Sequence, residues 1–170
     1  MKVLVPLVEG FEEIEAITPI NILRRAGASV TTAGATGLVR GGRGVSVQTD
    51  AMIADVLAHD WDMIVLPGGP GTKNLLGISG ILERLKRQAR EDCWLAAICA
   101  APTILHAAGL LTGKRVACFP TVEESLMGVE IVRDPVIVDG RIITSRGAGT
   151  ALPFALALVQ ALYGPAKRTE

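Results

Sequence analysis

The segment Leu95-Ala96-Ala97-Ile98-Cys99-Ala100-Ala101-Pro102 joins two structural patterns with no loop between them. An apolar run of strand character precedes Cys99, and a helix-like run follows it. A strand that feeds directly into a helix forces a sharp turn, the nucleophile elbow, which needs small residues two positions before and after the nucleophile. Ala97 and Ala101 fill those positions. Unpaired N–H groups at a helix start favour a thiolate, although a free cysteine is also often a buried structural residue.

The composition predicts a single domain, 1–170, with a sizeable core. The chain has 170 residues and 49% of them are apolar. Its 17 basic and 17 acidic residues cancel, which disfavours nucleic acid or a membrane surface as the main partner. No apolar stretch reaches the roughly 18 residues of a spanning helix. The three cysteines include no C-x-x-C pair, so we expect no disulfide framework, no metal site and a cytoplasmic protein.

Strand-like and helix-like segments alternate along the chain. The apolar run 2–8 predicts a strand buried on both faces. The segment after it opens with acidic residues, closes with Arg24-Arg25 and stops at Gly27, the order that a helix dipole favours. Pro19 either kinks this helix or marks its first turn. Further strands are expected at 28–33, 62–66, 94–98, 115–118, 129–132, 136–138 and 141–145. The segment 38–48 predicts either a small hairpin or an excursion at the sheet edge. Helices are expected at 50–59, 74–76, 80–90, 100–109, 121–127 and 150–163.

This alternation predicts an α/β fold with an open, mostly parallel sheet covered by helices on both faces. Ligands bind such sheets at the carboxyl ends of the strands. Three segments of interest fall at such ends, namely 9–15, Gly68-Gly69 and Cys99. Two helix boundaries are also predicted, with Thr121 and Glu124 as a capping box and Gly164-Pro165 as the end of the last helix.

Glu15 is the candidate partner of the Cys99 thiol. It lies near the start of the first helix, from which an inward side chain reaches the neighbouring strand end. A carboxylate beside a thiolate is a pair of like charges, so one of the two groups should hold a proton. Glu12 and Glu13 are instead expected to be solvated acids at the helix start, and Glu15 shares that alternative unless it faces inward.

The remaining candidates are backbone groups and cations. The glycines of Pro67-Gly68-Gly69-Pro70-Gly71 favour either a tight turn or an oxyanion site formed with the Ala100 N–H. His59 is expected on the surface, and His106 lies roughly 10 Å along the helix from Cys99, too far for a hydrogen bond. Arg146 either binds an anion or pairs across an interface, and Thr150 is the expected cap of the last helix.

Taken together, these segments resemble the ThiJ/PfpI superfamily, and within it the branch of the protein deglycases and the bacterial YajL-type proteins. The resemblance covers nearly the whole chain, with order and spacing preserved. It is carried by residues 9–15, 24–27, 65–69, 96–102 and 144–150.

The resemblance implies a flavodoxin-like fold, a homodimer and no cofactor. It makes Cys99 the oxidisable nucleophile, Glu15 its acid, and Gly69 and Ala100 the backbone donors, with Gly68 beside them. It also implies that Arg43 reaches the site of a partner subunit. Two departures concern histidine: Phe119 stands where the branch often has one, and Ala100 stands where the intracellular proteases have one.

Three functions follow as hypotheses. The first is a cofactor-independent glyoxalase or protein deglycase, in which the Cys99 thiolate attacks glyoxal, methylglyoxal or their early glycation adducts and Glu15 moves the protons. The second is an oxidative-stress sensor or chaperone that uses oxidation of Cys99. The third is a small amidase or protease, which the absence of a histidine base disfavours.

Overall fold

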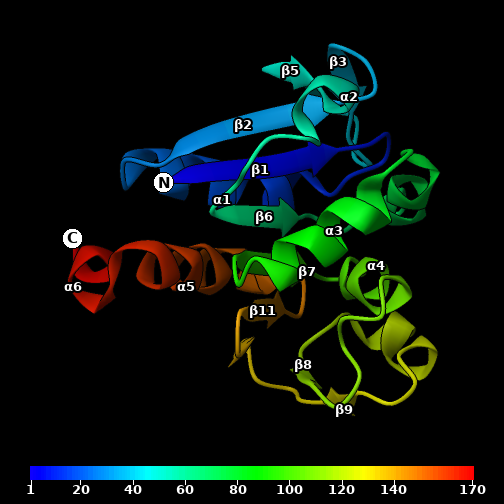
Figure 1. Ribbon diagram of the computed structural model, residues 1–170, viewed down its shortest axis with the longest axis vertical. Helices are drawn as coiled ribbons and strands as arrows, with labels where there is room; N and C mark the ends of the chain where they lie inside the picture. The colour runs from blue at the N-terminus through cyan, green and yellow to red at the C-terminus, as the bar shows by residue number, and fades with distance from the viewer.

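A computed structural model describes all residues, 1–170, and its centre is a seven-stranded sheet (Figure 1). The strand order is β10-β11-β7-β6-β1-β2-β5. Neighbouring strands are parallel except for the β10–β11 hairpin at one edge. The strands of this sheet are β1 (Lys2–Leu7), β2 (Ser29–Gly34), β5 (Ala51–Met52), β6 (Met63–Leu66), β7 (Trp94–Ile98), β10 (Val136–Asp139) and β11 (Ile142–Ser145).

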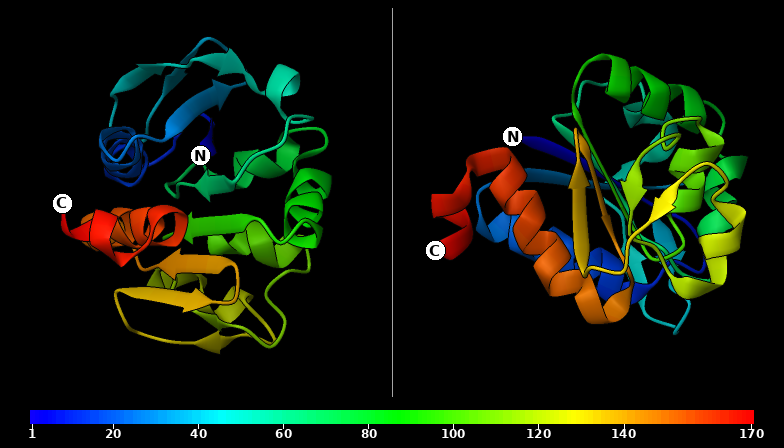
Figure 2. Two further views of the ribbon diagram at one scale, coloured as in Figure 1. Left: turned by 60° about the vertical axis from the view of Figure 1, so that its left-hand side comes forward. Right: turned by 90° about the horizontal axis from the view of Figure 1, so that it is seen from below.

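Helices cover both faces of the sheet, as Figure 2 shows from two sides. Helices α1 and α5 pack on one face, and α3, α4 and the 3₁₀ helix η1 lie on the other. The helices are α1 (Glu13–Arg25), α2 (Ile53–Val56), α3 (Ile81–Arg90), α4 (Pro102–Ala107), α5 (Ala151–Tyr163) and α6 (Pro165–Thr169), with 3₁₀ helices η1 (Thr72–Gly77), η2 (Pro120–Ser125) and η3 (Ala148–Thr150). No helix is both long enough and apolar enough to span a lipid bilayer.

The strand side chains alternate between two cores, one on each face of the sheet. In β1, Val3 and Val5 pack into the α1/α5 core, while Leu4 between them packs into the α3/α4 core. All three side chains are fully buried. This explains why β1 is a continuous apolar run, because both of its faces are covered. The predicted mostly parallel, two-sided α/β fold is confirmed.

Several element boundaries differ from the expectations. Helix α1 begins at Glu13 and runs through Pro19, so the prediction that Pro19 marks its first turn is wrong. The capping-box prediction is also wrong, because η2 begins at Pro120 and no side chain caps it. Helix α5 ends before Gly164 as expected, but it is not the last helix, because the short α6 starts at Pro165, a residue well suited to a first helical position. Strand β5 and the short η3 were not predicted.

Two further strand pairs lie beside the main sheet. Of the two alternatives for 38–48, the structure has the hairpin, formed by β3 (Leu38–Arg40) and β4 (Ser46–Gln48), which pair antiparallel. The strands β8 (Arg115–Val116) and β9 (Glu130–Ile131) pair in parallel, and both are shorter than predicted. The segment 117–120 that follows β8 turns back toward the carboxyl end of β7, where the Phe119 N–H donates to the Cys99 carbonyl.

We expect Gly71→Ala to destabilise the fold strongly. The Gly71 N–H donates to the Gly10 carbonyl, and a Cβ on Gly71 would lie 1.8 Å from the Glu9 carbonyl oxygen. The two loops must therefore separate, at a cost of about 3 kcal/mol in the free energy of unfolding. Urea unfolding measures this change in the free energy of unfolding. Gly77→Ala is the matched control, since its Cβ would meet nothing within 4 Å, and equal stability of the two variants would contradict the expectation.

Candidate active site

Cys99 occupies the turn between β7 and α4 in a conformation that is rare for a non-glycine residue. Its φ is +64°, in the left-handed region, which costs an L-residue roughly 1–2 kcal/mol. Backbone hydrogen bonds hold it there: its N–H donates to Ser145 O at 3.0 Å, and the Phe119 N–H donates to Cys99 O at 2.9 Å. Ala97 and Ala101 are fully buried. The predicted sharp turn with small flanking residues is thus present.

Glu15 faces inward from the first turn of α1 toward the Cys99 thiol. Its side chain is 1% exposed, whereas the neighbouring Ile14 points outward and is 52% exposed. The Glu15 carboxyl faces the Cys99 thiol, and each of the two groups shifts the pKa of the other. Glu15 Oε2 also accepts the Gly68 N–H at 3.0 Å, and the Ala148 N–H is a further donor to the carboxyl.

The loop after β6 has room for nothing larger than glycine. A Cβ on Gly68 would lie 2.7 Å from Cys99 Cβ and 2.7 Å from Glu15 Oε2. Gly69 has a φ of +111°, and a Cβ there would lie 2.4 Å from the Glu12 nitrogen. The backbone N–H groups of Gly69 and Ala100 face the Cys99 sulfur and act to lower the pKa of the thiol. The structure therefore brings together four predicted residues around Cys99.

The Cys99 thiol and the Glu15 carboxyl together retain one proton near neutral pH. Burial raises the pKa of Glu15 to about 7, although hydrogen bonds from the Cys99 thiol and the Gly68 N–H oppose this. Burial and the ionised Glu15 raise the pKa of Cys99 to about 12, against the two backbone N–H donors. The sequence suggested that the helix start would favour a thiolate at Cys99. The helix start alone does not give one. A thiolate near pH 7 requires Glu15 to hold the proton.

Comparisons with known proteins agree with this geometry. The sequence model of the DJ-1/PfpI family matches residues 1–161. The chain belongs to this family. It is 41% identical to Drosophila melanogaster protein dj-1beta, covering 98% of this chain and 92% of that one. The crystal structure of DJ-1beta superposes with a TM-score of 0.93 at 40% identity, covering 99% of this chain and 93% of that one.

The chain is also similar to two further relatives. The glutathione-independent glyoxalase DJR-1.2 of Caenorhabditis elegans is 40% identical, over 94% of this chain and 87% of its own length. The Arabidopsis thaliana protein DJ-1 homolog B is 37% identical over 99% of this chain. That relative is longer, and the match covers 40% of its length. The flavodoxin-like architecture expected from the sequence is the one that the family structures have.

Glu13 has a structural role that the sequence analysis missed. It was expected to be solvated, but it is only 8% exposed. Its Oε1 accepts the N–H groups of Arg43 at 2.7 Å and Val45 at 3.2 Å, and these bonds, with the Arg43 charge, help to hold the pKa of Glu13 below its usual value against burial. Glu13 therefore fixes the turn between β3 and β4 rather than the helix start.

The two predicted arginines lie apart from the thiol–carboxyl pair of this chain. Arg43 is exposed at the tip of that turn, and its only hydrogen-bonding side-chain contact is with the Gly42 carbonyl at 3.4 Å. Arg146 is half-buried and acts on Cys118, where its charge opposes the rise in pKa. Neither guanidinium forms a hydrogen bond or ion pair with Glu15 within this chain.

Cys93 and Cys118 have surroundings that disfavour their thiolates. Burial, followed by the charge of Glu123, raises the pKa of Cys118 to about 11. Burial, followed by the nearby Glu91 and Asp62, raises the pKa of Cys93. Neither sulfur has the pair of backbone N–H donors that Cys99 has. Cys99 differs from both in having these two donors, although burial and the Glu15 carboxyl raise its own pKa further, to about 12.

The histidines take no part in this site. His106 bonds through Nε2 to the Met127 carbonyl at 2.9 Å, which confirms its interpretation as a satisfied helix residue. His59 is exposed, as expected, beside Trp61. No three His, Cys, Asp or Glu side chains are grouped so as to hold a metal ion.

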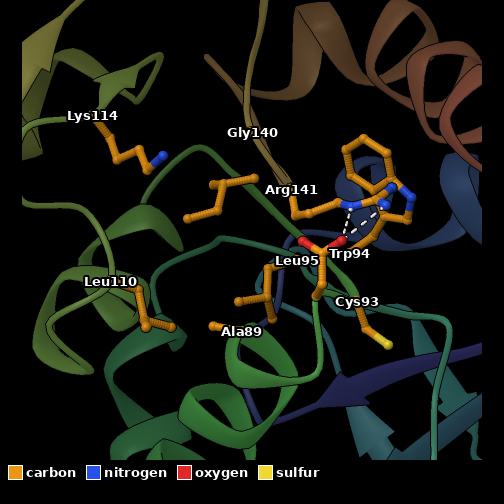
Figure 3. Close-up of a pocket in the computed structure, with 10 residues that line it drawn as sticks. Ala89, Cys93, Trp94, Leu95, Leu110, Lys114, Gly140 and Arg141 are labelled. Carbon is orange, nitrogen blue, oxygen red and sulfur yellow. Dashed lines mark hydrogen bonds and ion pairs between the residues drawn. The ribbon is translucent and has the colours of Figure 1, made fainter.

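A cavity of about 520 Å³ lies at the opposite end of β7 from Cys99 (Figure 3). It surrounds Trp94 at the start of the strand, roughly 16 Å from the elbow by strand rise. Arg141 stacks 4.9 Å above the Trp94 ring and pairs with Asp92 at 3.0 Å. Lys114, which also lines the cavity, pairs with Asp139. Because these charges are already compensated within the protein, the cavity offers no free charge, unlike the Cys99 site.

Proposed function

We propose that the protein is a glutathione-independent glyoxalase, which acts on glyoxal, methylglyoxal or their early glycation adducts. One observation carries the proposal: a cysteine at a strained elbow faces a buried acid whose pKa is raised to about 7, and two backbone N–H groups face its sulfur. The name of the Caenorhabditis elegans relative, a glutathione-independent glyoxalase, supports the same chemistry.

The reaction begins when the Cys99 thiolate adds to the aldehyde carbon of methylglyoxal. The C–S bond forms as the carbonyl π electrons move to oxygen, and this oxygen takes the proton that Glu15 holds, which gives a hemithioacetal and a Glu15 carboxylate. The N–H groups of Gly69 and Ala100 lie beside the sulfur and so are placed to stabilise the developing oxyanion. No external thiol is needed because Cys99 supplies the one that glutathione would otherwise supply.

Glu15 then moves one proton between adjacent carbons. As a carboxylate it removes the hydrogen from C1 while the C2 oxygen takes a proton, which gives an enediol. As an acid it then returns a proton to C2, and the C1 hydroxyl gives up its proton as the thioester carbonyl forms. The product is a thioester of a 2-hydroxy acid on Cys99. Water hydrolyses this thioester and releases lactate, or glycolate from glyoxal, with the thiol restored. A pKa of about 7 suits a group that both takes and gives a proton near neutral pH.

The same chemistry extends to protein repair. Early adducts of these aldehydes with cysteine, arginine and lysine side chains revert to the free aldehyde, so an enzyme that consumes the aldehyde also clears the adducts. The deglycase activity proposed here therefore needs no second site. Its substrates are small reactive aldehydes or the glycated side chains that release them.

The test is lactate formation from methylglyoxal with no glutathione present. We expect many molecules of lactate per chain, because the thiol is regenerated in each cycle. Cys93→Ala is the matched control, since Cys93 lies at the other end of β7 and should leave turnover unchanged. Loss of methylglyoxal without lactate would contradict the proposal, because simple trapping of the aldehyde by thiols and amines consumes it without isomerisation.

We further propose that the chain works as a homodimer and that Arg43 of each subunit approaches the site of the other. Glu13 holds the turn that carries Arg43, and the large apolar side chains Ile14, Ile17 and Val45 are exposed around it. Exposed apolar clusters of this kind favour protein association. Sedimentation equilibrium should give twice the chain mass at micromolar concentration, and a single chain mass there would contradict a stable dimer.

A further inference from the structure

The hydroxyl groups of Ser145 and Thr150 form a hydrogen-bonded pair beside the candidate active site, with their oxygens 2.7 Å apart. The Ser145 hydroxyl donates its one proton to the Pro135 carbonyl at 2.7 Å. Thr150 Oγ1 accepts the Gly147 N–H at 3.1 Å and lies 2.9 Å from the Gly147 carbonyl oxygen. The Thr150 hydroxyl therefore donates to Ser145 or to this carbonyl and has an acceptor in either orientation.

The Thr150 hydroxyl does not cap helix α5, which is the role expected from the sequence. Thr150 stands at the N-cap position of α5, but its side chain makes no capping hydrogen bond to that helix. It bonds backward to Gly147 instead, and the Thr150 N–H also donates to the Gly147 carbonyl at 2.8 Å. These bonds hold the turn 147–150, which contains η3.

This turn faces one oxygen of the Glu15 carboxyl. A Cβ on Gly147 would lie 3.7 Å from Glu15 Oε1, and the Ala148 N–H faces the carboxyl and acts to lower its pKa. The other oxygen, Oε2, accepts the Gly68 N–H at 3.0 Å. The carboxyl is therefore held between the loop after β6 and the turn after β11, the two strands that flank β7 in the sheet.

Ser145 also connects this turn to the nucleophile. It is fully buried at the end of β11. Its carbonyl accepts the Cys99 N–H at 3.0 Å, and its side chain contacts the Thr150 hydroxyl. One residue thus anchors the backbone of the elbow and, through Thr150, the turn that faces the acid.

We propose that Ser145 and Thr150 are positioning residues, which hold the Ala148 N–H toward the Glu15 carboxyl and so set how Glu15 and Cys99 divide their one proton. The inference rests on the proposed function, in which this proton is moved. After the pair loses its first proton, it exists either as a carboxylate beside a thiol or as a carboxylic acid beside a thiolate. An N–H that faces the carboxyl favours the first form, because it stabilises the charged carboxylate.

Few charged groups face Glu15. Glu12, on the segment before α1, raises its pKa, and the Cys99 thiol faces it from the end of β7. The glycine loop after β6 contributes a backbone N–H only, and helix α5, which packs on α1, has no charged residue. Arg146 forms no hydrogen bond or ion pair with the carboxyl. The turn 147–150 therefore influences Glu15 through its backbone.

The test is the rate at which iodoacetamide alkylates Cys99 across pH, measured by mass spectrometry of the peptide that contains Cys99. This rate follows the thiolate and needs no aldehyde. In the wild type we expect a rise centred near pH 7, where the pair loses its first proton, and a plateau above it. Thr150→Val removes the hydroxyl and keeps the shape of the side chain. It raises the midpoint by about 0.5–1 pH unit and the plateau rate about three- to tenfold. The rate well below the midpoint stays unchanged, because Glu15 is protonated there.

Ser145→Ala is expected to shift the midpoint and the plateau in the same directions. Thr150→Ser restores a hydroxyl and should return both to the wild-type values. Thr32→Val is the matched control, because the Thr32 hydroxyl is also buried but bonds to Asp50 at 2.8 Å rather than to the site. Thermal unfolding of every variant shows that it is folded.

Two outcomes would overturn the positioning role while leaving the glyoxalase function intact in a wild type that forms lactate. One is a midpoint within about 0.2 pH units of the wild type in both Thr150→Val and Ser145→Ala. The other is an equal shift in Thr32→Val, since a general loosening of the fold would then explain the change. A wild type that forms no lactate from methylglyoxal overturns the proposed function, whatever the midpoints are.

Discussion

Replacing Cys99 by alanine is expected to lower lactate formation from methylglyoxal at least about a thousandfold. The reason is that the substrate carbon is bonded to this sulfur throughout the isomerisation, and no other thiol lies beside Glu15. Cys118 is buried and Cys93 lies at the far end of β7. The measurement is the initial rate of lactate formation, with the free enzyme checked for correct folding by circular dichroism.

The matched variant for this prediction is Cys118→Ala, which removes a buried thiol next to Phe119, the residue whose N–H donates to the Cys99 carbonyl. It is expected to retain most of the activity and to lose some stability through the cavity that it leaves. Retention of a tenth or more of the wild-type rate by Cys99→Ala would show that lactate is made without covalent attachment to this residue.

Glu15→Gln is expected to lower the rate about a hundredfold to ten-thousandfold. Glutamine has nearly the same shape and still accepts the Gly68 N–H that Glu15 accepts at 3.0 Å. It cannot take the proton from C1, so the hemithioacetal forms but does not isomerise. Mass spectrometry of the trapped protein should therefore show aldehyde adducts on Cys99 without turnover. A glutamine variant with wild-type kcat would contradict the role of Glu15 as the proton carrier.

The same substitution is expected to stabilise the folded protein at alkaline pH. The folded pKa of Glu15 is raised from 4.5 to about 7, so the folded chain binds this proton more tightly than the unfolded chain does. Wild-type stability therefore falls as the pH rises from about 4.5 to 7, by at most about 3 kcal/mol. The Glu15→Gln variant does not lose this stability, because glutamine does not ionise. Urea unfolding at pH 5 and pH 8 should show that the free energy of unfolding of the variant, relative to the wild type, is higher at pH 8 than at pH 5. The same difference at both pH values would contradict this expectation.

The sheet and the elbow were predictable because local sequence determines them. Strands buried on both faces require continuous apolar runs, which β1 and β6 show. The junction at Cys99 requires small neighbours, and Ala97 and Ala101 supply them. Glu15 was identifiable through the helical period, since Glu15, Pro19 and Leu23 lie four residues apart and all are buried. The family resemblance then related the elbow, the acid and the glycine loop to one another.

Other features depend on contacts between distant segments. Glu13 was expected to be solvated from its place at a helix start, yet it binds a turn thirty residues away. Its spacing of three from Ala16 and seven from Ile20, which are both buried, was the available indication that it faces inward. The position of Phe119 over Gly147 follows from how the segment after β8 turns back to the elbow. Neither residue's neighbours nor any helical or strand period predicts that contact.

The ionisation of the thiol also required the structure. A helix start near Cys99 suggested a thiolate, but burial and the facing carboxyl outweigh it. Helix α4 begins only at Pro102 and has six residues, and the dipole effect is confined to the first turn. What the structure provides instead is a proton shared between sulfur and carboxyl. The central claim is that this pair, acting as a unit, carries the reaction.

The pH dependence of kcat/KM for lactate formation from methylglyoxal tests that claim most directly. If the pair loses its first proton near pH 7 and its second near pH 12, the rate should rise through pH 7 and then stay level up to about pH 10. Glu15→Gln should remove the step at pH 7 from its residual rate. A wild-type rate that instead rises through pH 9, the usual value for an isolated cysteine, would contradict the shared proton.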